Sequence, residues 1–429
     1  MKGCRGLVAF FMLFCLLSPL FADEPENEFY FRGRFYLDWY GSAYQETDFY
    51  HQLSSRLKVE LFNRRGQGWN LLIDTRNRTR LSEEASNHII LYDARLSFER
   101  TDSPWYLSLG QMNLYDTAGI GQLLGGLVGV KLKPGFLLGG YAGLESSVYI
   151  DRVDKDYGKF GVFTRYLGRL GRQFSLSYNM VRYGGETERK YIYAGGLYPV
   201  NDSLVFYGNM EYEMASHIKT TDRLSRIFLN VRFDPVELID LTAHYSSGRG
   251  LDFHRFVIDA SKDPTLNDSS LERYYYTRQY GLRFSLKPVK GVRLYISRQE
   301  REQKDDNIRN HTWRFGFSTL NVFQTGFTAY GNYAVNRGEI SESDSFYLSL
   351  AKDFGRISAS LSLSNTFNGI RFVPGLETPQ VIHLDDYKTI AADVFVPINR
   401  AIALSFQYEY FIQEESNQHM FFVRFMWRK

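Results

Sequence analysis

The sequence predicts an all-β protein: a transmembrane antiparallel β-barrel of about 22 strands, within a range of roughly 18–24, with short periplasmic turns. Three observations lead to this class. The chain begins like an exported protein, alternation of apolar and polar residues recurs along almost all of the rest, and tight turns alternate with longer polar connections. A secreted all-β protein that packs a second sheet over its apolar faces is the alternative.

The start of the chain has the composition of a secretory signal peptide. Lys2 and Arg5 precede the apolar stretch Leu7–Phe21, and the small residue Ala22 ends that stretch. A basic start, an apolar middle and a small residue at the cut are the marks of such a signal. We therefore expect 1–22 to be removed, leaving a single barrel domain over 23–429.

The composition argues against several classes of function. Both cysteines, Cys4 and Cys15, lie in the signal, so we expect no disulfide, no thiolate metal site and no covalently attached haem. The formal net charge is +3 with no polybasic block, which disfavours nucleic acid as a partner. The mean hydropathy is −0.33 and 16% of residues are aromatic, values that suit a barrel crossing an outer membrane. We expect no cofactor.

Period-two alternation, the period of a β-strand, runs from the first segment to the last. The segment 29–40, "FYFRGRFYLDWY", sets Phe, Leu and Trp against Arg, Tyr and Asp, and 53–62 behaves alike. The segment 355–365, "GRISASLSLSN", sets Ile, Ala and Leu against serines, and 401–411 alternates in the same way. Each of these segments is therefore predicted to form a strand with one apolar face.

The connections between these segments predict the strand number. One kind is tight and rich in Gly, Pro, Asn and Asp, the residues that turns require. We place ten such turns at Arg64–Gln67, Thr101–Pro104, Lys133–Gly135, Arg169–Arg172, Pro199–Asp202, Asp234–Glu237, Lys287–Gly291, Asn321–Thr325, Asp353–Gly355 and Pro397–Asn399. Ten turns with both termini on the turn side require eleven two-stranded hairpins. Most connections at the other rim are short, with Gly248–Ser270 and Phe367–Asp386 as exceptions that could fold inward or serve as docking surfaces.

The tryptophans decide between the membrane barrel and a secreted sandwich. Each falls near a strand end on the apolar face of its strand, at Trp39, Trp69, Trp105, Trp313 and Trp427. Amphipathic rings at both rims of an apolar band form the aromatic girdle of a membrane barrel. We therefore expect these five side chains at the membrane interface of an outer membrane, in a Gram-negative-type bacterium.

The segment 419–429, "HMFFVRFMWRK", carries the clearest family likeness. Phe421, Val423, Phe425 and Trp427 share one face, and this pattern resembles the last strand of bacterial outer-membrane porins, which the barrel-assembly machinery recognises. The resemblance implies an assembly signal at these four residues, although Arg428 and Lys429 follow where that family usually stops. The glycine-rich segment Ser108–Leu132 is also similar to the third hairpin of porin-like channels.

The polar strand faces are expected to line the lumen and to carry many cations. We predict these pore-lining residues: Arg32, Arg34, Arg56, Lys58, Arg76, Arg78, Arg95, Arg226, Arg232, Arg283, Arg293, Arg314 and Arg424. Acids at Asp38, Glu60, Asp74, Asp93 and Glu99 accompany the first of them, so the wall is mixed with a slight basic excess. One interpretation is a water-filled pore that favours anions, because guanidinium binds oxyanions well. The alternative is that these charges pair and stiffen the wall.

No catalytic site is predicted. None of the eight histidines has a metal-binding spacing. The segment His244–Gly248, "HYSSG", is similar to the HxSNG element of outer-membrane phospholipases but has Ser247 where that family has Asn. The alternation also points His244 inward, whereas the resemblance would require it to face lipid. We therefore expect no enzyme and no metal.

Two functions remain open. The first is a porin that lets small hydrophilic solutes, anions among them, diffuse passively. The second is a barrel sheath around a multihaem cytochrome, since wide barrels with short loops resemble the porin component of porin–cytochrome conduits. Outer-membrane lipid and the assembly machinery are expected partners in both, and a monomer and a self-trimer are both left open.

Overall fold

A computed structural model of the chain describes most of the barrel. The described residues are 29–44, 48–63, 68–81, 87–100, 102–115, 117–146, 155–216, 223–249, 276–303, 308–322, 325–339, 341–370, 382–413 and 417–429. The predicted signal peptide 1–22 lies outside them, as do most of the two long connections and the turn at 64–67. Among the described residues, no helix is long and apolar enough to span a membrane.

The described residues form 22 strands and one short 3₁₀ turn, η3 (Arg169–Gly171). The strands are β1 (Phe29–Tyr44), β2 (Asp48–Asn63), β3 (Gly68–Arg80), β4 (Asn87–Glu99), β5 (Trp105–Leu114), β6 (Gly121–Lys133), β7 (Phe136–Leu144), β8 (Tyr157–Leu167), β9 (Gln173–Tyr183), β10 (Glu186–Pro199), β11 (Leu204–Ser216), β12 (Leu224–Val236), β13 (Ile239–Arg249), β14 (Tyr276–Leu286), β15 (Val292–Gln303), β16 (Ile308–Val322), β17 (Phe327–Gly338), β18 (Ser341–Phe354), β19 (Ile357–Ile370), β20 (Ile382–Pro397), β21 (Ile402–Ile412) and β22 (Asn417–Arg428).

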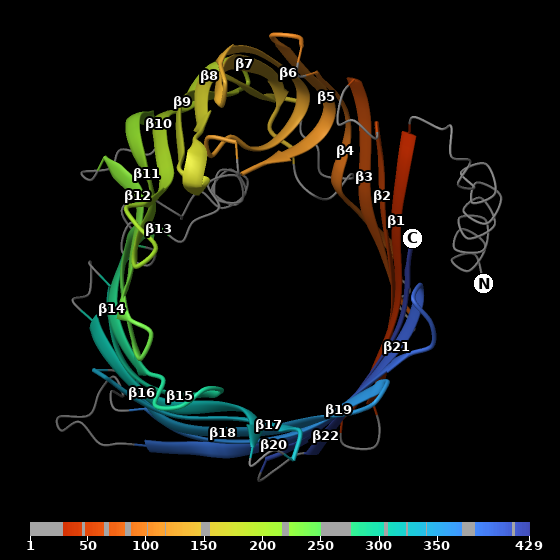
Figure 1. The fold of residues 1–429 in the computed structure, drawn as a ribbon, viewed down its shortest axis with the longest axis vertical. Helices are drawn as coiled ribbons and strands as arrows, with labels where there is room; N and C mark the ends of the chain where they lie inside the picture. The colour runs from red at the N-terminus through yellow and green to blue at the C-terminus, as the bar shows by residue number, and fades with distance from the viewer. Residues whose placement is uncertain are drawn as a thin grey trace.

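The strands close into one antiparallel barrel. Each strand pairs with its neighbours in sequence, and β1 pairs with β22, so that Leu37 lies opposite Phe425 and Trp39 opposite Val423. Figure 1 shows the resulting ring, with β1 beside the blue strands of the C-terminal end. Closure leaves no unpaired sheet edge, which a bilayer would not tolerate. The predicted fold class, a 22-stranded porin-like barrel, is confirmed.

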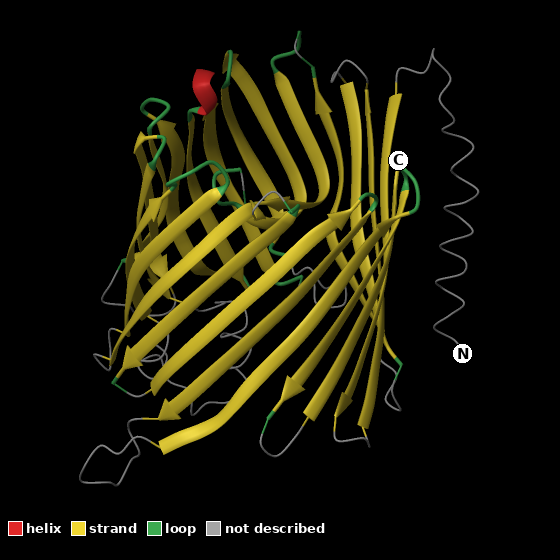
Figure 2. Cartoon of the chain, turned by 60° about the horizontal axis from the view of Figure 1, so that its bottom comes forward, coloured by secondary structure: helices red, strands yellow, loops and turns green. Residues whose placement is uncertain are grey.

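The connections sort onto two rims. One rim, here called the turn side, holds the connections at 64–67, 100–104, 134–135, 168–172, 200–203, 237–238, 287–291, 323–326, 355–356 and 398–401. Nine of the ten predicted turns coincide with connections on this rim within a few residues, and the tenth, Arg64–Gln67, lies outside the described residues. The strand ends that flank 250–275 and 371–381, two ranges outside the described residues, lie on the opposite rim, the loop side, as does the short connection 184–185. Figure 2 shows the strands running obliquely between the two rims.

Polar contacts and glycine backbone angles shape the turn-side connections. In the turn after β4, Arg100 donates two hydrogen bonds to the Asp102 carboxylate, at 2.9 and 2.6 Å, and lowers the pKa of that carboxyl. Gly135 adopts φ 81°, and a Cβ there would lie 2.0 Å from the carbonyl oxygen of Leu167. These turns therefore hold the hairpins in register through backbone geometry that the sequence makes visible.

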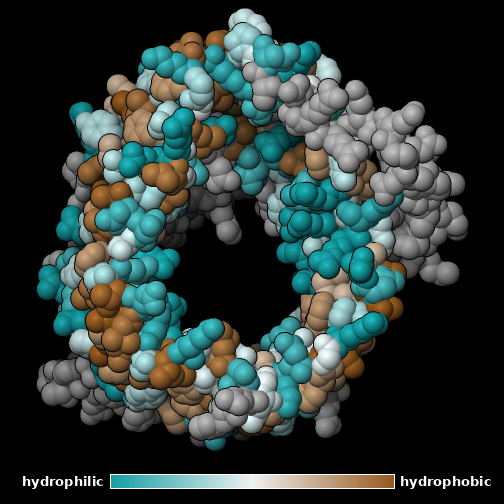
Figure 3. All heavy atoms as spheres, viewed as in Figure 1, coloured by the Kyte–Doolittle hydropathy of each residue, from teal (hydrophilic) through white to brown (hydrophobic). Residues whose placement is uncertain are grey.

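Each strand has an outward and an inward face. Cross-strand partners share a face, so the register can be followed around the whole ring from Asp38 on β1 to Arg424 on β22, which lie opposite each other. Outward residues are large and apolar yet solvent-accessible, such as Leu109, Val162, Leu282 and Leu361 at 56–58% exposure. That arrangement is typical of a lipid-facing band. Figure 3 shows hydrophilic side chains around much of the central opening.

Candidate functional site: the barrel lumen

The inward face is the candidate site, and its cations come from strands around the whole ring. The register places all thirteen predicted pore-lining cations on the same face as Asp38: Arg32 and Arg34 on β1, Arg56 and Lys58 on β2, Arg76 and Arg78 on β3, Arg95 on β4, Arg226 and Arg232 on β12, Arg283 on β14, Arg293 on β15, Arg314 on β16 and Arg424 on β22. Whether they act on a permeating solute stays a prediction.

Eight of these cations form ion pairs, as the wall-stiffening interpretation predicts. Arg56 binds Asp74 through two hydrogen bonds, at 2.8 and 2.7 Å. Asp38 accepts from Arg424 at 2.7 Å and lies 3.6 Å from Arg76, which ties β1 to β22 and β3. The remaining pairs are Arg32 and Lys58 with Glu60, Arg95 with Asp93, Arg232 with Asp234 and Arg293 with Asp240. Much of the inward charge is therefore neutralised locally.

Five predicted lumen arginines form no ion pair within the described part of the chain: Arg34, Arg78, Arg226, Arg283 and Arg314. Two of them have neutral neighbours. Arg314 donates to Gln299 at 3.2 Å, and the Arg283 guanidinium lies 4.0 Å from the ring centre of Tyr295. These five keep their positive charge available, so they are the part of the wall that can attract an anion.

The β5–β6 hairpin breaks the rule of a polar inward face. Met112, Ile120 and Leu123 are fully buried and pack with Leu127 and Phe163 in an apolar cluster on the lumen side of the wall. The loop-side end of the hairpin reaches β9, where the Ser177 hydroxyl donates to the carbonyl of Ala118 at 2.7 Å. Figure 1 shows the loop-side end of this hairpin inside the ring next to β9 and β10. The lumen is therefore filled along this sector.

A row of glycines accompanies the inward course of the hairpin. Gly110, Gly125 and Gly143 lie opposite one another on β5, β6 and β7. Gly110 has φ 125°, and a Cβ on it would lie 2.1 Å from the Ala94 carbonyl oxygen. A Cβ on Gly125 would lie 2.2 Å from the Ala142 carbonyl oxygen. Only glycine permits this close approach of neighbouring backbones.

Ionised side chains are buried behind the inward hairpin. Lys159, 2% exposed, lies 2.9 Å from Glu145. Arg189 on β10 lies 2.5 Å from Glu213 and 2.9 Å from Glu211. Our sequence-based list of lumen residues missed this group. These charged residues could have been found in the sequence, because they stand among inward positions that are mostly apolar or aromatic.

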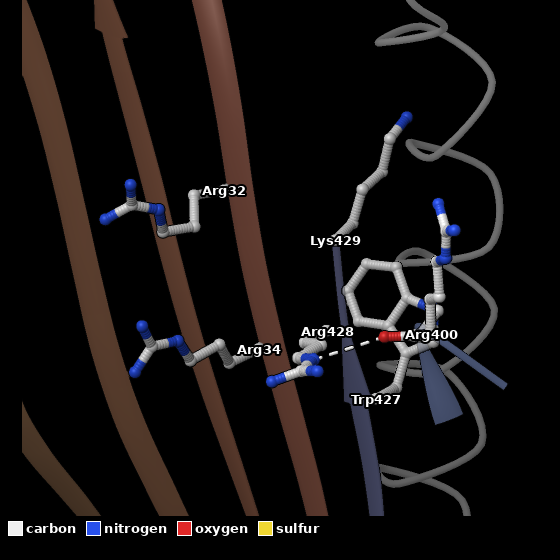
Figure 4. A pocket seen from close by; sticks show the side chains of 7 residues that line it. Arg32, Arg34, Arg400, Trp427, Arg428 and Lys429 are labelled. Carbon is white, nitrogen blue, oxygen red and sulfur yellow. Dashed lines mark hydrogen bonds between the residues drawn. The ribbon is translucent and has the colours of Figure 1, made fainter. Parts of the chain in front are cut away.

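Figure 4 shows the turn-side end of the seam between β1 and β22, where a pocket of about 490 Å³ lies. Arg32 and Arg34 lie on one side of the end of β22, and Trp427 lies on the other side with Arg400 and Lys429. The Arg428 side chain donates to the carbonyl of Arg400 at 3.2 Å. The seam thus separates inward arginines from an outward tryptophan.

The outward aromatic residues fall toward both rims. Trp69, Trp105 and Trp427 lie at turn-side strand ends, whereas Trp39 and Trp313 lie in the loop-side halves of β1 and β16. The predicted assembly residues Phe421, Val423, Phe425 and Trp427 share the outward face of β22. Contact with the membrane interface and recognition by an assembly machinery stay predictions.

His244 lies on the inward face, as its alternation predicts, in the same row as Gly281. Its ring would contact a Cβ on Gly281 at 2.3 Å, and its Nε2 lies 3.4 Å from the Gln279 amide nitrogen. Within the described ranges, no group of three His, Cys, Asp or Glu side chains is placed to hold a metal ion. The absence of enzymatic activity stays a prediction.

Comparisons with known proteins match the architecture but identify no family. No family model and no curated protein sequence matches the chain. The fold is similar to Pseudomonas aeruginosa OccD3 (OpdP), with a TM-score of 0.47, 8% identity and coverage of 93% of this chain and 91% of that one. It is also similar to the translocation pore of the P pilus usher PapC (0.49; 14%; 92% and 99%) and to Acinetobacter baumannii OccAB1 (0.44; 10%; 94% and 97%). These values carry no information about a solute.

Proposed function

We propose that this chain is an outer-membrane channel through which small hydrophilic solutes diffuse passively, with a preference for anions. The observation that carries the proposal is a closed ring with an outward apolar band and a central opening whose margin is largely hydrophilic. Outer-membrane barrels conduct through such polar interiors. The tryptophans toward both rims also support a barrel that spans a bilayer from one rim to the other.

The anion preference rests on the difference between paired and unpaired charges. An ion pair such as Arg56 with Asp74 presents little net charge to a solute. Arg34, Arg78, Arg226, Arg283 and Arg314 have no such carboxylate in the described part of the chain. Rings of unpaired arginine select anions in pores, and guanidinium binds oxyanions in a planar, bidentate way.

The test is planar-bilayer conductance of the refolded protein in a salt gradient. We expect single-channel steps without any partner and a reversal potential that reports anion selectivity. Arg226→Gln and Arg314→Gln together should reduce that selectivity. The matched control is Arg298→Gln, since Arg298 is paired with Glu300 and lies on the outward face of β15.

Three results would contradict the proposal. Cation selectivity of the wild-type channel would remove the anion preference. An equal loss of selectivity in the Arg298→Gln control would show that the inward arginines are not its source. A folded but silent barrel would overturn passive diffusion and return the cytochrome-sheath hypothesis, which co-purification with a haem protein would then test.

A further inference from the structure

A polar pocket of about 420 Å³ lies on the inward wall of β15, β16, β17 and β18, in the loop-side half of the barrel. Four amide side chains, three hydroxyls and two arginines contribute most of its lining: Gln299, Asn310, Asn332, Asn336, Thr312, Ser343, Ser345, Arg301 and Arg314. None of these lining residues is an acid. Volumes of about 300–1,000 Å³ are usual for sites that bind small molecules.

Hydrogen bonds within the pocket orient its polar groups in advance. Arg314 donates to the Gln299 amide oxygen at 3.2 Å, and Thr312 donates to the Asn336 amide oxygen at 3.0 Å. Gln299 faces Thr312, and Thr312 faces Asn336, across successive strands. Because these bonds hold Gln299, Arg314 and Asn336, a solute that matches their remaining hydrogen-bonding groups binds with a smaller loss of conformational entropy.

A group of tyrosines continues this surface toward the turn side. Asn332, which lines the pocket, donates to the Tyr330 hydroxyl at 3.2 Å, and that hydroxyl lies 3.1 Å from the hydroxyl of Tyr295. The ring of Tyr347 is 5.7 Å from that of Tyr330. Arg283 lies over the ring of Tyr295. The sector thus combines flat aromatic surfaces with amides and arginines along one path through the lumen.

We propose that this pocket is a binding site for saccharides that carry an oxyanion, either a carboxylate or a phosphate. The proposal rests on the proposed channel function and names its solute class. Amides and hydroxyls both donate and accept, so they match the hydroxyl groups of a sugar. Arg301 and Arg314 bind the oxyanion, because no carboxylate in the pocket competes for them. The tyrosine rings contact the apolar faces of the sugar ring.

Neither the arginines alone nor the amides and hydroxyls alone would predict an anionic saccharide. A simple carboxylate would use the arginines but leave the four amides and three hydroxyls without partners. A neutral sugar would leave two guanidinium groups without an anion. Arg226 lacks this setting: it lies on β12, opposite Glu211 and Gly248, between the filled sector and the pocket.

The test compares four probes on the open channel: glucuronate, glucose 6-phosphate, glucose and acetate. We expect glucuronate or glucose 6-phosphate to interrupt the single-channel current at concentrations at least tenfold below those of glucose and acetate. Asn336→Ala and Arg314→Gln should each weaken that effect about tenfold. Arg298→Gln, on the outward face of β15 and paired with Glu300, is the matched control and should leave it unchanged. Block by one probe alone identifies the carboxylate or the phosphate as the preferred oxyanion.

Equilibrium binding to the detergent-solubilised barrel, measured by calorimetry, separates this proposal from the channel function. Binding of glucuronate or glucose 6-phosphate by a barrel that does not conduct would support the pocket and overturn passive diffusion. A conducting channel that neither binds nor is blocked by the two anionic sugars more strongly than by acetate and glucose overturns the pocket alone. Equal losses in Arg298→Gln and Arg314→Gln would also overturn it.

Discussion

The sectors β5–β10 and β15–β19 belong to the same barrel wall, but the inner surface of the first is covered and largely apolar, whereas that of the second is open and polar. In β5–β10 the wall is covered from inside by the end of the β5–β6 hairpin, and the side chains between them include Met112 and Leu123, both with no exposed surface. In β15–β19 a single layer of strands presents amides, serines and tyrosines to the opening. A strand face that points inward is therefore polar only where water reaches it.

This difference predicts different responses to the same kind of substitution. The filled sector behaves like the core of a soluble protein, in which charges must be paired and volume must be conserved. The open sector behaves like a protein surface, where most substitutions change stability little. Each prediction below therefore pairs one variant from the filled sector with a matched variant whose side chain is open to water or faces outward.

The largest effect is expected from Arg189→Gln. This change leaves Glu211 and Glu213 without their cation, and Glu213 is 3% exposed. Breaking a buried pair by removing one partner costs about 3–5 kcal/mol. Arg314→Gln, in the open sector, should cost less than about 0.5 kcal/mol. Urea unfolding of the refolded barrels in lipid vesicles, followed by tryptophan fluorescence, measures both.

A triple variant tests whether the loss comes from the unpaired acids. Adding Glu211→Gln and Glu213→Gln to Arg189→Gln should restore much of the free energy of unfolding, because no buried charge then lacks a partner. If Arg189→Gln and Arg314→Gln prove equally mild, water reaches β10 as freely as it reaches β16, and the distinction between the sectors fails.

The next effect is expected from Leu123→Ala. Leu123 is fully buried against Met112 and Leu127 on the inward side of β6. Removing such a side chain leaves a cavity and costs about 2–5 kcal/mol. Leu361→Ala, on the outward face of β19 at 56% exposure, leaves no cavity. We expect a loss below about 1 kcal/mol there. A larger single-channel conductance in Leu123→Ala alone would also show that the hairpin narrows the pore.

The architecture could be predicted from the sequence because its signals are local. Each strand shows its alternation of apolar and polar residues, and each turn contains the Gly, Pro, Asn or Asp residues that its backbone needs. The inward hairpin could not, although Ser108–Leu132 was already notable for its glycines. In Gly121–Leu132 both strand faces are apolar, and period two says nothing of what the second face meets. That face packs with Tyr141 and Phe163 on β7 and β8. Ala118, in the connection beside it, accepts a hydrogen bond from Ser177, 59 residues further along the chain.

For the lumen charges, too, the sequence predicts one property and leaves another open. Alternation alone assigns Asp38 and Arg76 to the inward face, but their partners depend on which strands become neighbours. Asp38 binds Arg424 across the seam between β1 and β22, a contact over 386 residues of sequence. Sequence composition could therefore predict a mixed wall with a basic excess, whereas the distinction between paired and free arginines required the register.

An intermediate effect is expected from Gly125→Ala. Its Cβ would lie 2.2 Å from the carbonyl oxygen of Ala142 and 2.6 Å from the Cα of Gly143, so backbone must move. Overpacking of this kind costs about 1–3 kcal/mol. Gly158→Ala on β8 is the control, since a Cβ there meets nothing within 4 Å. Heat-modified mobility on gels and the urea midpoint report both variants, and an equally stable Gly125→Ala would show that the hairpin does not need the glycine row.

The smallest effect is expected from replacing a serine by alanine, a change that can be made separately in each sector. Ser177→Ala removes the donor to the buried Ala118 carbonyl, and leaving such a group unsatisfied costs about 1–3 kcal/mol. Ser362→Ala on β19 removes a hydroxyl that has no hydrogen bond within the described residues, so we expect a change below about 0.5 kcal/mol. The difference between the two urea midpoints is the quantity to measure. Equal midpoints would mean that water replaces the Ser177 donor, and that the inward hairpin packs more loosely on β9 than its contacts require.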